Sequence, residues 1–467
     1  MMFYLCKGMR FTRIFTVLTG GVFLLHCASK PEAGVPNKPT FADHIAPIVY
    51  KNCSPCHRDS GAAPFPLTTY AQVKKKAKTI AKVTAKRYMP PWPADPAYSH
   101  FVGEKYLTDA EIATIASWVG QGCSPGQNGE NLSWRATSWR SNIGKPDMVL
   151  PLQAVELLSN LQDRFFLVKI PGLLPRDTWV RAIEFVAGEP NLVHHFNGHI
   201  LMYESGAKKN HAKPPFNVEI TSAEYDSDFS KLDLLNDNGS KPFRLHSAVN
   251  YLPGVQATAY PNGIGAFRLS KKFTVVGNDL HYGPGNRKTT DKSYINLFFT
   301  DKPPTRETRE LMLGTNGVSP IVPPLQIEPN TRSRHSTRFQ VDADISLLTI
   351  NPHLHLLGKS VKGYAVKPNG DTVKLISIPK WDFRWQYFYT FKKPVHLPAG
   401  TWIISEAEFD NTSANPNNPN QPPKRVGERL EYGGASMRAR DEMFQFILTY
   451  MLYQRGDEDM LLEVKER

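Results

Sequence analysis

After Lys145 the chain is a succession of short apolar and β-branched runs, separated by residues that favour turns. Clear examples are Phe165–Ile170, Trp179–Val186, Leu192–Tyr203, Phe273–His281, Leu347–Leu357 and Trp402–Phe409. Strands of a parallel sheet need helical crossovers between them, and no helical pattern alternates with these runs. The sequence therefore predicts two antiparallel, jelly-roll-like β-sandwich domains, at residues 146–302 and 330–467, joined by a Pro-rich bridge at residues 303–329.

Residues 40–125 have the apolar spacing of helices instead, with a capping-box pattern that begins at Thr108. Within this part stands Cys53-Ser54-Pro55-Cys56-His57, which has the C-x-x-C-H spacing of a c-type haem attachment site. In such a site the two thiols bind the porphyrin covalently and the imidazole ligates the iron. The predicted fold class is therefore multidomain: a small all-α cytochrome c domain at residues 40–125, a linker at residues 126–145, and the two β-sandwich domains.

A second iron ligand is expected on the Pro-rich loop Arg87–Pro93, which contains Met89. Prolines fix the backbone, so this loop can hold a side chain firmly against a flat cofactor. A thioether opposite His57 would complete six-coordinate haem c and raise its potential. The alternative is an ordinary methionine on a loop.

The first residues have the pattern of an export signal, with basic residues before an apolar stretch from Ile14 to Leu25. Cys27 stands where a bacterial lipoprotein would be cleaved, although His26 departs from the usual small residue. We therefore expect residues 1–27 to be a signal, residues 28–39 to be a tether, and the protein to be exported to the periplasm or cell envelope, either with a lipid anchor at Cys27 or soluble. Cys6 lies in the presumed signal, Cys27 lies at its end, and Cys53 and Cys56 are assigned to haem. Cys123 is then left alone, so we expect no intrachain disulfide.

The formal net charge of +13 raises the question of an anionic partner. The basic residues are dispersed apart from a run at residues 74–78, and no zinc-finger or RNA-binding motif is present. We therefore expect no nucleic-acid binding. The lysine run is interpreted as a solvated helix face, with a docking patch for an acidic electron donor as the alternative.

Histidines and a methionine in the strand-rich part form candidate metal sites. His353 and His355 are two apart, so on a strand they share a face and form half of a site. His194 and His195 are adjacent, so both reach one metal only where a strand end or bulge turns one ring. The remaining candidates are His281 and Met443, with His246 as an alternative to His281, His199 as an alternative within the His194–His195 pair, and Met437 as an alternative to Met443. Imidazole and thioether ligands suit copper in both oxidation states.

The order His-His, His-Tyr-Gly, His-x-His, Asp-Glu-Met resembles that of the copper type II monooxygenases, the peptidylglycine α-hydroxylating and dopamine β-monooxygenase family. The resemblance covers residues 146–467, and the chain is most similar to the bacterial members that carry a fused cytochrome c. Further segments that resemble the family are Asp177–Glu184, Pro352–Lys359 and Trp381–Gln386. It implies two copper ions. One, held by His194, His195 and His281, would relay an electron, and the other, held by His353, His355 and Met443, would carry out the oxygen chemistry.

Two departures from the peptide-hydroxylating enzymes concern the substrate. Those enzymes hold their substrate with an Arg two residues before H-x-H and a Tyr four residues after the Met, where this chain has Asn351 and Ile447. A peptide carboxylate is therefore not the expected substrate. The leading hypothesis is an exported copper monooxygenase that hydroxylates a C–H bond of a small molecule with O2, with electrons from a donor cytochrome or small reductant passing through haem c. The alternative is a non-enzymatic electron-transfer or copper-handling envelope protein.

Overall fold

The computed structural model describes residues 34–463 except 60, 136–140, 142, 160–162, 212–213, 221–230, 254, 256, 262 and 429–439. The expected export signal, Cys27 and Met437 therefore lie outside the described residues, as does the side chain of His246. Within the described part, no helix is both long and apolar enough to cross a membrane.

Among the described residues, the α-helices lie between residues 46 and 120, and the two longer ones begin where the sequence provides caps. The helical elements in this part of the chain are a π-helical turn η1 (Phe41–Ile45), α1 (Ala46–Asn52), α2 (Tyr70–Ala85), α3 (Asp109–Gly120) and a 3-10 turn η2 (Gly129–Asn131). Thr69 and Thr108 both form capping boxes, with Gln72 and Glu111 respectively. The apolar faces of the helices meet in a small core around Phe41, Val73, Ile115 and Trp118.

Two antiparallel sheets follow, and their inner faces share one core; we call them the first sheet pair. Their strands are β1 (Met148–Pro151), β3 (Arg164–Leu173), β4 (Thr178–Val186), β5 (Val193–Tyr203), β6 (Phe216–Glu219), β7 (Phe243–Tyr251), β8 (Phe267–Leu269), β9 (Lys272–Tyr282) and β11 (Tyr294–Thr300). The strand orders are β6-β3-β9-β5-β7 and β1-β11-β4-β8, and β2 (Val155–Leu157) pairs separately with β10 (Thr289–Asp291). Phe196 and Phe273 are fully buried between the sheets.

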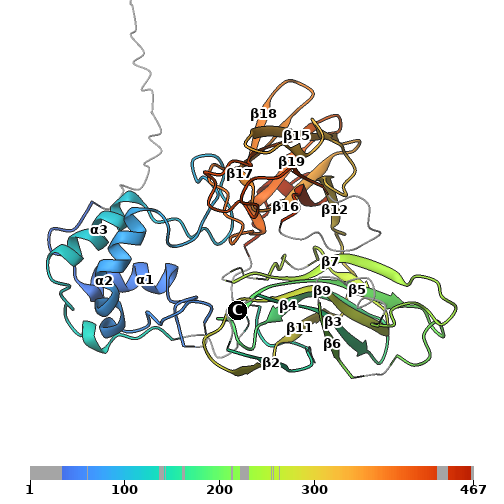
Figure 1. Ribbon diagram of the computed structural model, residues 1–467, viewed down its shortest axis with the longest axis horizontal. Helices are drawn as coiled ribbons and strands as arrows, with labels where there is room; N and C mark the ends of the chain where they lie inside the picture. Colours follow the sequence, from blue (N-terminus) through green and yellow to red (C-terminus); the bar gives the residue numbers. More distant parts are fainter. Residues whose placement is uncertain are drawn as a thin grey trace, which may run out of the picture.

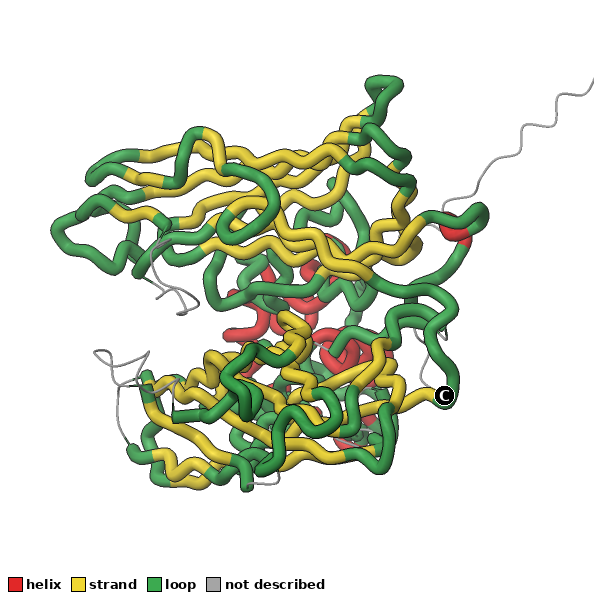
Figure 2. Tube along the Cα trace, turned by 90° about the vertical axis from the view of Figure 1, so that its right-hand side faces the viewer, coloured by secondary structure: helices red, strands yellow, loops and turns green. Residues whose placement is uncertain are grey.

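The second sheet pair has the same layered arrangement. Its strands are β12 (Arg309–Gly314), β13 (Ile321–Val322), β15 (Arg332–Gln340), β16 (Ile345–Leu354), β17 (Gly358–Val366), β18 (Thr372–Ile378), β19 (Tyr389–Leu397), β20 (Trp402–Asp410) and β22 (Phe444–Leu452). The orders are β12-β22-β16-β19 and β13-β15-β20-β17-β18. A short pair, β14 (Gln326–Ile327) with β21 (Val426–Gly427), and the 3-10 turn η3 (Asp457–Asp459) complete the described part. Figures 1 and 2 show the two pairs one above the other, with the helices to one side.

The predicted fold class is wrong. The described chain is mostly β-sheet, with several antiparallel sheets and three short α-helices, and we see no all-α cytochrome c domain in it. Helical spacing and caps located the helices, but they carry no information about where the loops between them pack. The domain boundaries given above stay predictions.

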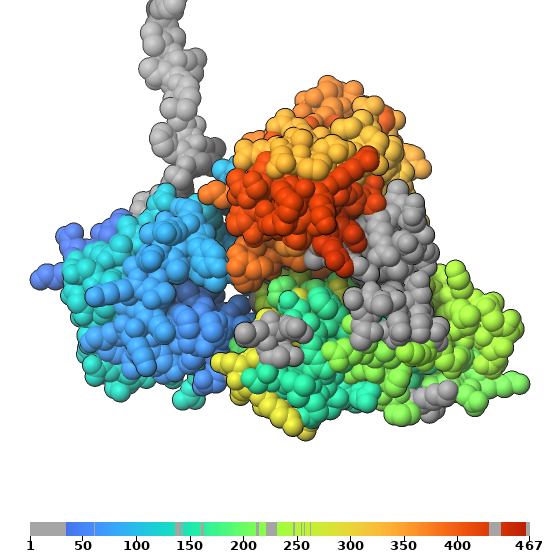
Figure 3. Space-filling model, viewed as in Figure 1, coloured from blue at the N-terminus to red at the C-terminus, as the bar shows by residue number. Residues whose placement is uncertain are grey.

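The loop between α2 and α3 packs on the second sheet pair. Phe101 is 1% exposed within the core of that pair and forms an isolated bridge with Phe391 of β19. The Val102 N–H donates to the Thr390 carbonyl at 2.7 Å, and the Asp95 N–H donates to the Ser377 carbonyl at 2.8 Å. Figure 3 shows this contact, where light-blue atoms meet the orange second pair. The helical part is therefore joined to the sheets by a shared core.

Candidate functional site

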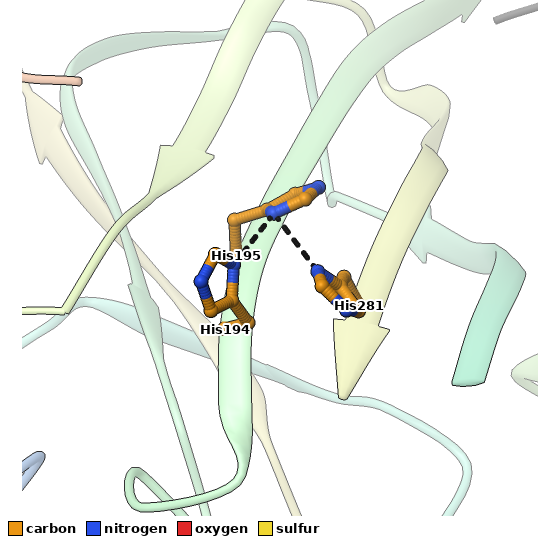
Figure 4. A group of neighbouring side chains, drawn as sticks. All are labelled: His194, His195 and His281. Atoms are coloured by element: carbon orange, nitrogen blue, oxygen red, sulfur yellow. Dashed lines mark hydrogen bonds between the residues drawn. The ribbon is translucent and has the colours of Figure 1, made fainter. Parts of the chain in front are cut away.

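Three histidines from neighbouring strands form a cluster in the first sheet pair. His194 and His195 lie on β5 and His281 lies on β9, and one ligand atom from each falls within 4.8 Å of the others. The Nδ1 atom of His195 is 3.3 Å from that of His194 and 3.4 Å from that of His281 (Figure 4). This spacing allows one ion to contact all three imidazoles.

An irregularity in β5 brings the adjacent histidines together. The pairing of β5 with β9 shifts register between Val193 and His195, after which His195 faces His281 directly. In a regular strand, adjacent side chains point to opposite faces, and a bulge removes that constraint. The geometric condition for His194 and His195 to share one metal is therefore met.

Carboxylates hold the outer nitrogens of two of these rings. His195 Nε2 lies 2.7 Å from Asp279, and His281 Nε2 lies 2.8 Å from Asp163. Such bonds place the proton on Nε2 and leave Nδ1 as the free electron pair toward the centre of the cluster. Burial, then the neighbouring His281 and His195, lowers the pKa of His194 to about 4. Burial likewise lowers the pKa of His281, so both rings are neutral, as metal ligation requires.

The second candidate site lies at the junction of β16 and β22. His353 lies near the end of β16 and His355 directly follows that strand, and their ring centroids are 5.0 Å apart. Met443 directly precedes β22. His353 Nδ1 is hydrogen-bonded to Gln386 Oε1, and His355 Nδ1 donates to the Asp441 carbonyl at 2.8 Å. These two bonds set the orientations of the rings. The donor set of two imidazoles and one half-buried thioether suits copper.

Glu442 ties together the backbones that carry these ligands. Its carboxylate is fully buried and accepts hydrogen bonds from the N–H groups of His355 at 2.5 Å, Leu357 at 3.0 Å and Met443 at 3.0 Å. Burial raises the pKa of Glu442 to about 8, although these three bonds act in the opposite direction. One side chain thus fixes the end of β16 relative to Met443.

The two sites lie close enough for their charges to interact. Burial, then His355, lowers the pKa of His353 to about 3, and His195 of the other cluster contributes to the same lowering. The two candidate sites therefore lie within electrostatic range of each other, although they belong to different sheet pairs.

The C-x-x-C-H run follows α1. Cys53 is the C-cap of that helix, and Cys53 and Cys56 are free thiols. His57 Nδ1 is 2.9 Å from the Phe65 carbonyl, so its Nε2 is available as a ligand, and burial lowers the pKa of His57 toward the neutral ring. This arrangement of donors fits covalent haem c. Met89 lies half-buried on the loop after α2, where its N–H donates to the Val83 carbonyl.

Several polar partners were not anticipated from the sequence. Asp163, Asp279, Gln386 and Glu442 hold the candidate ligands, but only Glu442 is next to one of them in sequence. Asp279 could have been suspected, because its side chain is two residues from His281 on a strand. His199 was the alternative to one histidine of the His194–His195 pair. Among the described residues, the cluster contains His194 and His195 and does not include His199.

Comparison with known proteins gives one informative match. No curated protein matches the chain. Among solved structures, the infectious bursal disease virus VP2 subviral particle is 8% identical over 68% of this chain and 74% of that chain, with a TM-score of 0.17. PNGF-II is 11% identical over 67% and 63%, with a TM-score of 0.18, and the PBSX exported protein XepA is 11% identical over 61% and 92%, with a TM-score of 0.12. These values are too low to relate the folds.

The match to a protein family covers most of the second sheet pair. It spans residues 311–418, which include His353, His355 and Gln386 but end before Met443. The ligand-bearing strand β16 and the segment that holds His353 thus lie inside the match. Residues 311–418 are therefore similar to the C-terminal domain of the copper type II ascorbate-dependent monooxygenases, a family of copper-dependent oxidoreductases.

Proposed function

We propose that this protein is a copper-dependent monooxygenase that hydroxylates a C–H bond of a small molecule with O2. The observation that carries the proposal is the family match across β16, where Gln386 and the Asp441 carbonyl orient the imidazoles of His353 and His355. His353, His355 and Met443 would hold the copper ion of the oxygen chemistry. His194, His195 and His281 would hold a second copper ion, supported by their common centre.

Copper, when bound at these ligands, would supply one-electron chemistry and activation of dioxygen. The residues of this chain set the conditions for that chemistry. Gln386 and the Asp441 carbonyl fix the ring orientations of His353 and His355. Asp163 and Asp279 do the same for the cluster in the first pair and increase the basicity of its imidazoles.

The electrons would come from a donor cytochrome or a small reductant such as ascorbate and would pass through a c-type haem. Cys53 and Cys56 would attach this haem, and His57 and Met89 would ligate its iron. The support is local: two free thiols, and an imidazole whose Nδ1 is held by the Phe65 carbonyl. Each copper would store one electron for the reaction.

The substrate would lack a peptide carboxylate. Asn351 stands where the peptide-hydroxylating enzymes have a substrate-binding Arg, and its amide already donates to the Tyr387 carbonyl at 3.0 Å. An uncharged amide with that bond offers no cationic partner to a carboxylate.

The reaction would take place outside the cytoplasm. The export-signal pattern of residues 1–27 supports a periplasmic or envelope location, with a lipid anchor at Cys27 as one outcome and a soluble exported protein as the other.

The test is oxygen uptake by copper-loaded protein during a screen of small hydrophobic and polar substrates. We expect uptake that depends on substrate, with one atom of labelled O2 in the product, and loss of both in His355→Ala. Copper binding with redox cycling but no product would support the alternative, an electron-transfer or copper-handling protein. No copper at either ligand group would contradict both functions.

A further inference from the structure

The loop that carries Met89 lies directly on the segment that holds His353. Tyr387 Oη donates to the Pro91 carbonyl at 2.8 Å, and the Trp92 ring lies 5.6 Å from the Tyr387 ring. On the other side of Met89, the Tyr88 hydroxyl is 3.4 Å from the Arg384 guanidinium. Residues 88–92 and 384–387 therefore pack as one unit, although they belong to opposite ends of the chain.

The same segment continues to a candidate copper ligand. Gln386, next to Tyr387, has its Nε2 bound to the Phe383 carbonyl at 2.8 Å, which turns its Oε1 toward His353 Nδ1. Asn351 holds the backbone carbonyl of Tyr387 from β16. A continuous path of covalent bonds and two hydrogen bonds thus runs from Met89 through Pro91, Tyr387 and Gln386 to His353.

A separate contact leads from the C-x-x-C-H loop to the other site. With its nitrogen facing that loop, the Asn191 side-chain amide donates to the carbonyls of Gly61 and Ala63 at 2.6 and 3.0 Å. Asn191 is three residues before His194. The two candidate copper sites therefore have different contacts with the helical part.

We propose that the Tyr387–Gln386 path delivers an electron directly to the copper ion at His353, His355 and Met443, without passage through the His194–His195–His281 cluster. The inference rests on the proposed function. In this step haem iron(II) loses one electron and becomes iron(III), while copper(II) gains it and becomes copper(I). No bond forms or breaks and no proton moves. Tyr387 and Gln386 are positioning residues in this step, because they hold the path and do not touch the reacting atoms.

The first experiment removes the cluster as a relay. His281→Ala protein, with haem attached and copper bound at the remaining site, is mixed rapidly with a one-electron reductant under anaerobic conditions. Haem oxidation state is followed by its absorbance, and copper(II) at the remaining site by electron paramagnetic resonance. We expect copper to be reduced after the haem at a rate close to that of the unchanged protein. A relay through the cluster would instead abolish this reduction, which would overturn the proposal.

The second experiment tests the path itself. Tyr387→Phe removes the hydrogen bond to Pro91 and should slow electron arrival at the His353 site several-fold. Tyr389→Phe is the matched control, because the buried Tyr389 hydroxyl has no hydrogen-bond partner in the structure and lies in the same aromatic cluster. Asn191→Ala should leave this rate unchanged. Equal rates in Tyr387→Phe and Tyr389→Phe, or a fall confined to Asn191→Ala, would overturn the proposal.

Failure of the inference can be told apart from failure of the proposed function. If haem attaches and product forms but Tyr387→Phe keeps the full transfer rate, the path is wrong and the enzyme stands. If no haem attaches to the Cys53–His57 loop, the electron supply in the proposed function is wrong. An unchanged copper(II) spectrum in Tyr387→Phe would show that the slower rate comes from the path and not from a distorted copper site.

Discussion

His195, His281, His353 and His355 each have one ring nitrogen bonded to a protein group outside the candidate ligands. The partners are Asp279, Asp163, Gln386 and the Asp441 carbonyl. The bonded nitrogen is Nε2 in the cluster, whereas it is Nδ1 at the β16 site. Because the linked nitrogen differs, the two sites hold their rings in different orientations and should give copper different surroundings.

Removal of one cluster histidine should separate the sites by stoichiometry. We expect the unchanged protein to bind two copper ions and His281→Ala to bind one, because two imidazoles are a weaker site than three. Copper per chain, measured by elemental analysis after dialysis, gives the answer. A matched control is His396→Ala, whose ring stacks on Tyr453 away from both ligand groups. Loss of all copper in His281→Ala would contradict the hypothesis that the two sites bind copper independently.

Glu442 should be important for stability as well as for the site. Glu442→Gln keeps the size of the side chain but replaces one accepting oxygen with a donor, so at least one buried N–H of His355, Leu357 or Met443 loses its partner. An unsatisfied buried donor costs about 1–3 kcal/mol. Urea unfolding at neutral pH should show that loss of unfolding free energy. The exposed Glu463→Gln should show no change.

At this scale the sequence located candidate ligands better than their partners. His353 and His355 could be found from the spacing of residues that share a strand face, whereas His194, His195 and His281 were brought together by the family resemblance. Asp163 could not be found, since it is 118 positions from His281, and Asp279, 84 positions from His195, could have been suspected only from its place near His281. Strand pairing brings such residues together, and a local sequence pattern does not predict the register in which two strands pair.

At the scale of elements, the histidine cluster depends on close packing between β5 and β9. The Phe196 ring of β5 is fully buried over two glycines, Gly198 and Gly277. A Cβ atom at Gly277 would lie 2.4 Å from that ring and 3.1 Å from the Val168 side chain. Two residues further along β9 lies Asp279, and then His281. Glycine at position 277 therefore lets the two ligand-bearing strands approach each other.

Gly277→Ala should disturb the cluster without affecting the β16 site. Overpacking of a core costs typically about 1–3 kcal/mol, and the strain here would move β9 relative to β5. We expect a lower melting temperature and a changed copper spectrum from the cluster, with the spectrum of the second site unchanged. Gly370→Ala, at an open turn in the second pair, controls for an effect of the added methyl group itself, although its positive φ of 89° adds local strain. If the copper spectra of both sites were the same in Gly277→Ala as in the unchanged protein, the prediction would be contradicted.

The elements also show where prediction from sequence failed. The capping-box pattern at Thr108 located α3 because caps are local. The all-α cytochrome c domain was wrong in part because Phe101 packs with the second sheet pair, a contact with Phe391 that is 290 positions distant and has no periodic signature. Periodicity predicts the faces of an element and not the partner that covers them.

At the scale of the whole molecule, Arg306 joins three parts of the chain. Its backbone forms an isolated parallel bridge with Ile264, which precedes β8 and whose side chain packs in the core of the second sheet pair. Its guanidinium binds both carboxylate oxygens of Asp457 near the C-terminus, at 2.7 and 2.8 Å, and Ser346 of β16 donates to the same carboxylate. The side chains of Arg306 and Asp457 are 12% and 4% exposed, so the pair lies out of water. Their contact ties the segment before β12 to the residues after β22.

This ion pair should make stability depend on acid pH. Burial raises the pKa of Asp457, but the hydrogen bonds from Arg306 and Ser346 outweigh it and lower the pKa to about 2. Between that value and the ordinary value the unfolded chain binds the proton more readily, so stability falls as pH drops through this range. The contribution, roughly 2 kcal/mol, is complete above the ordinary pKa. Asp457→Asn should lose this pH dependence in acid unfolding curves, and it should be less stable at neutral pH because Arg306 loses its partner. If the unfolding free energies of Asp457→Asn and the unchanged protein fell equally with decreasing pH, the low pKa would not belong to Asp457.

The bridge between Phe101 and Phe391 has a consequence for the exposed edge of a sheet. β19 is the last strand of its sheet, and a free strand edge presents unpaired N–H and C=O groups to any other chain. Residues 101–102 occupy part of that edge through Phe101 and the bond to Thr390. A second sheet pair produced without residues 1–125 would expose both this edge and the aromatic surface beneath it. Residues 101–102 thus hinder edge-to-edge association of the second sheet pair through β19.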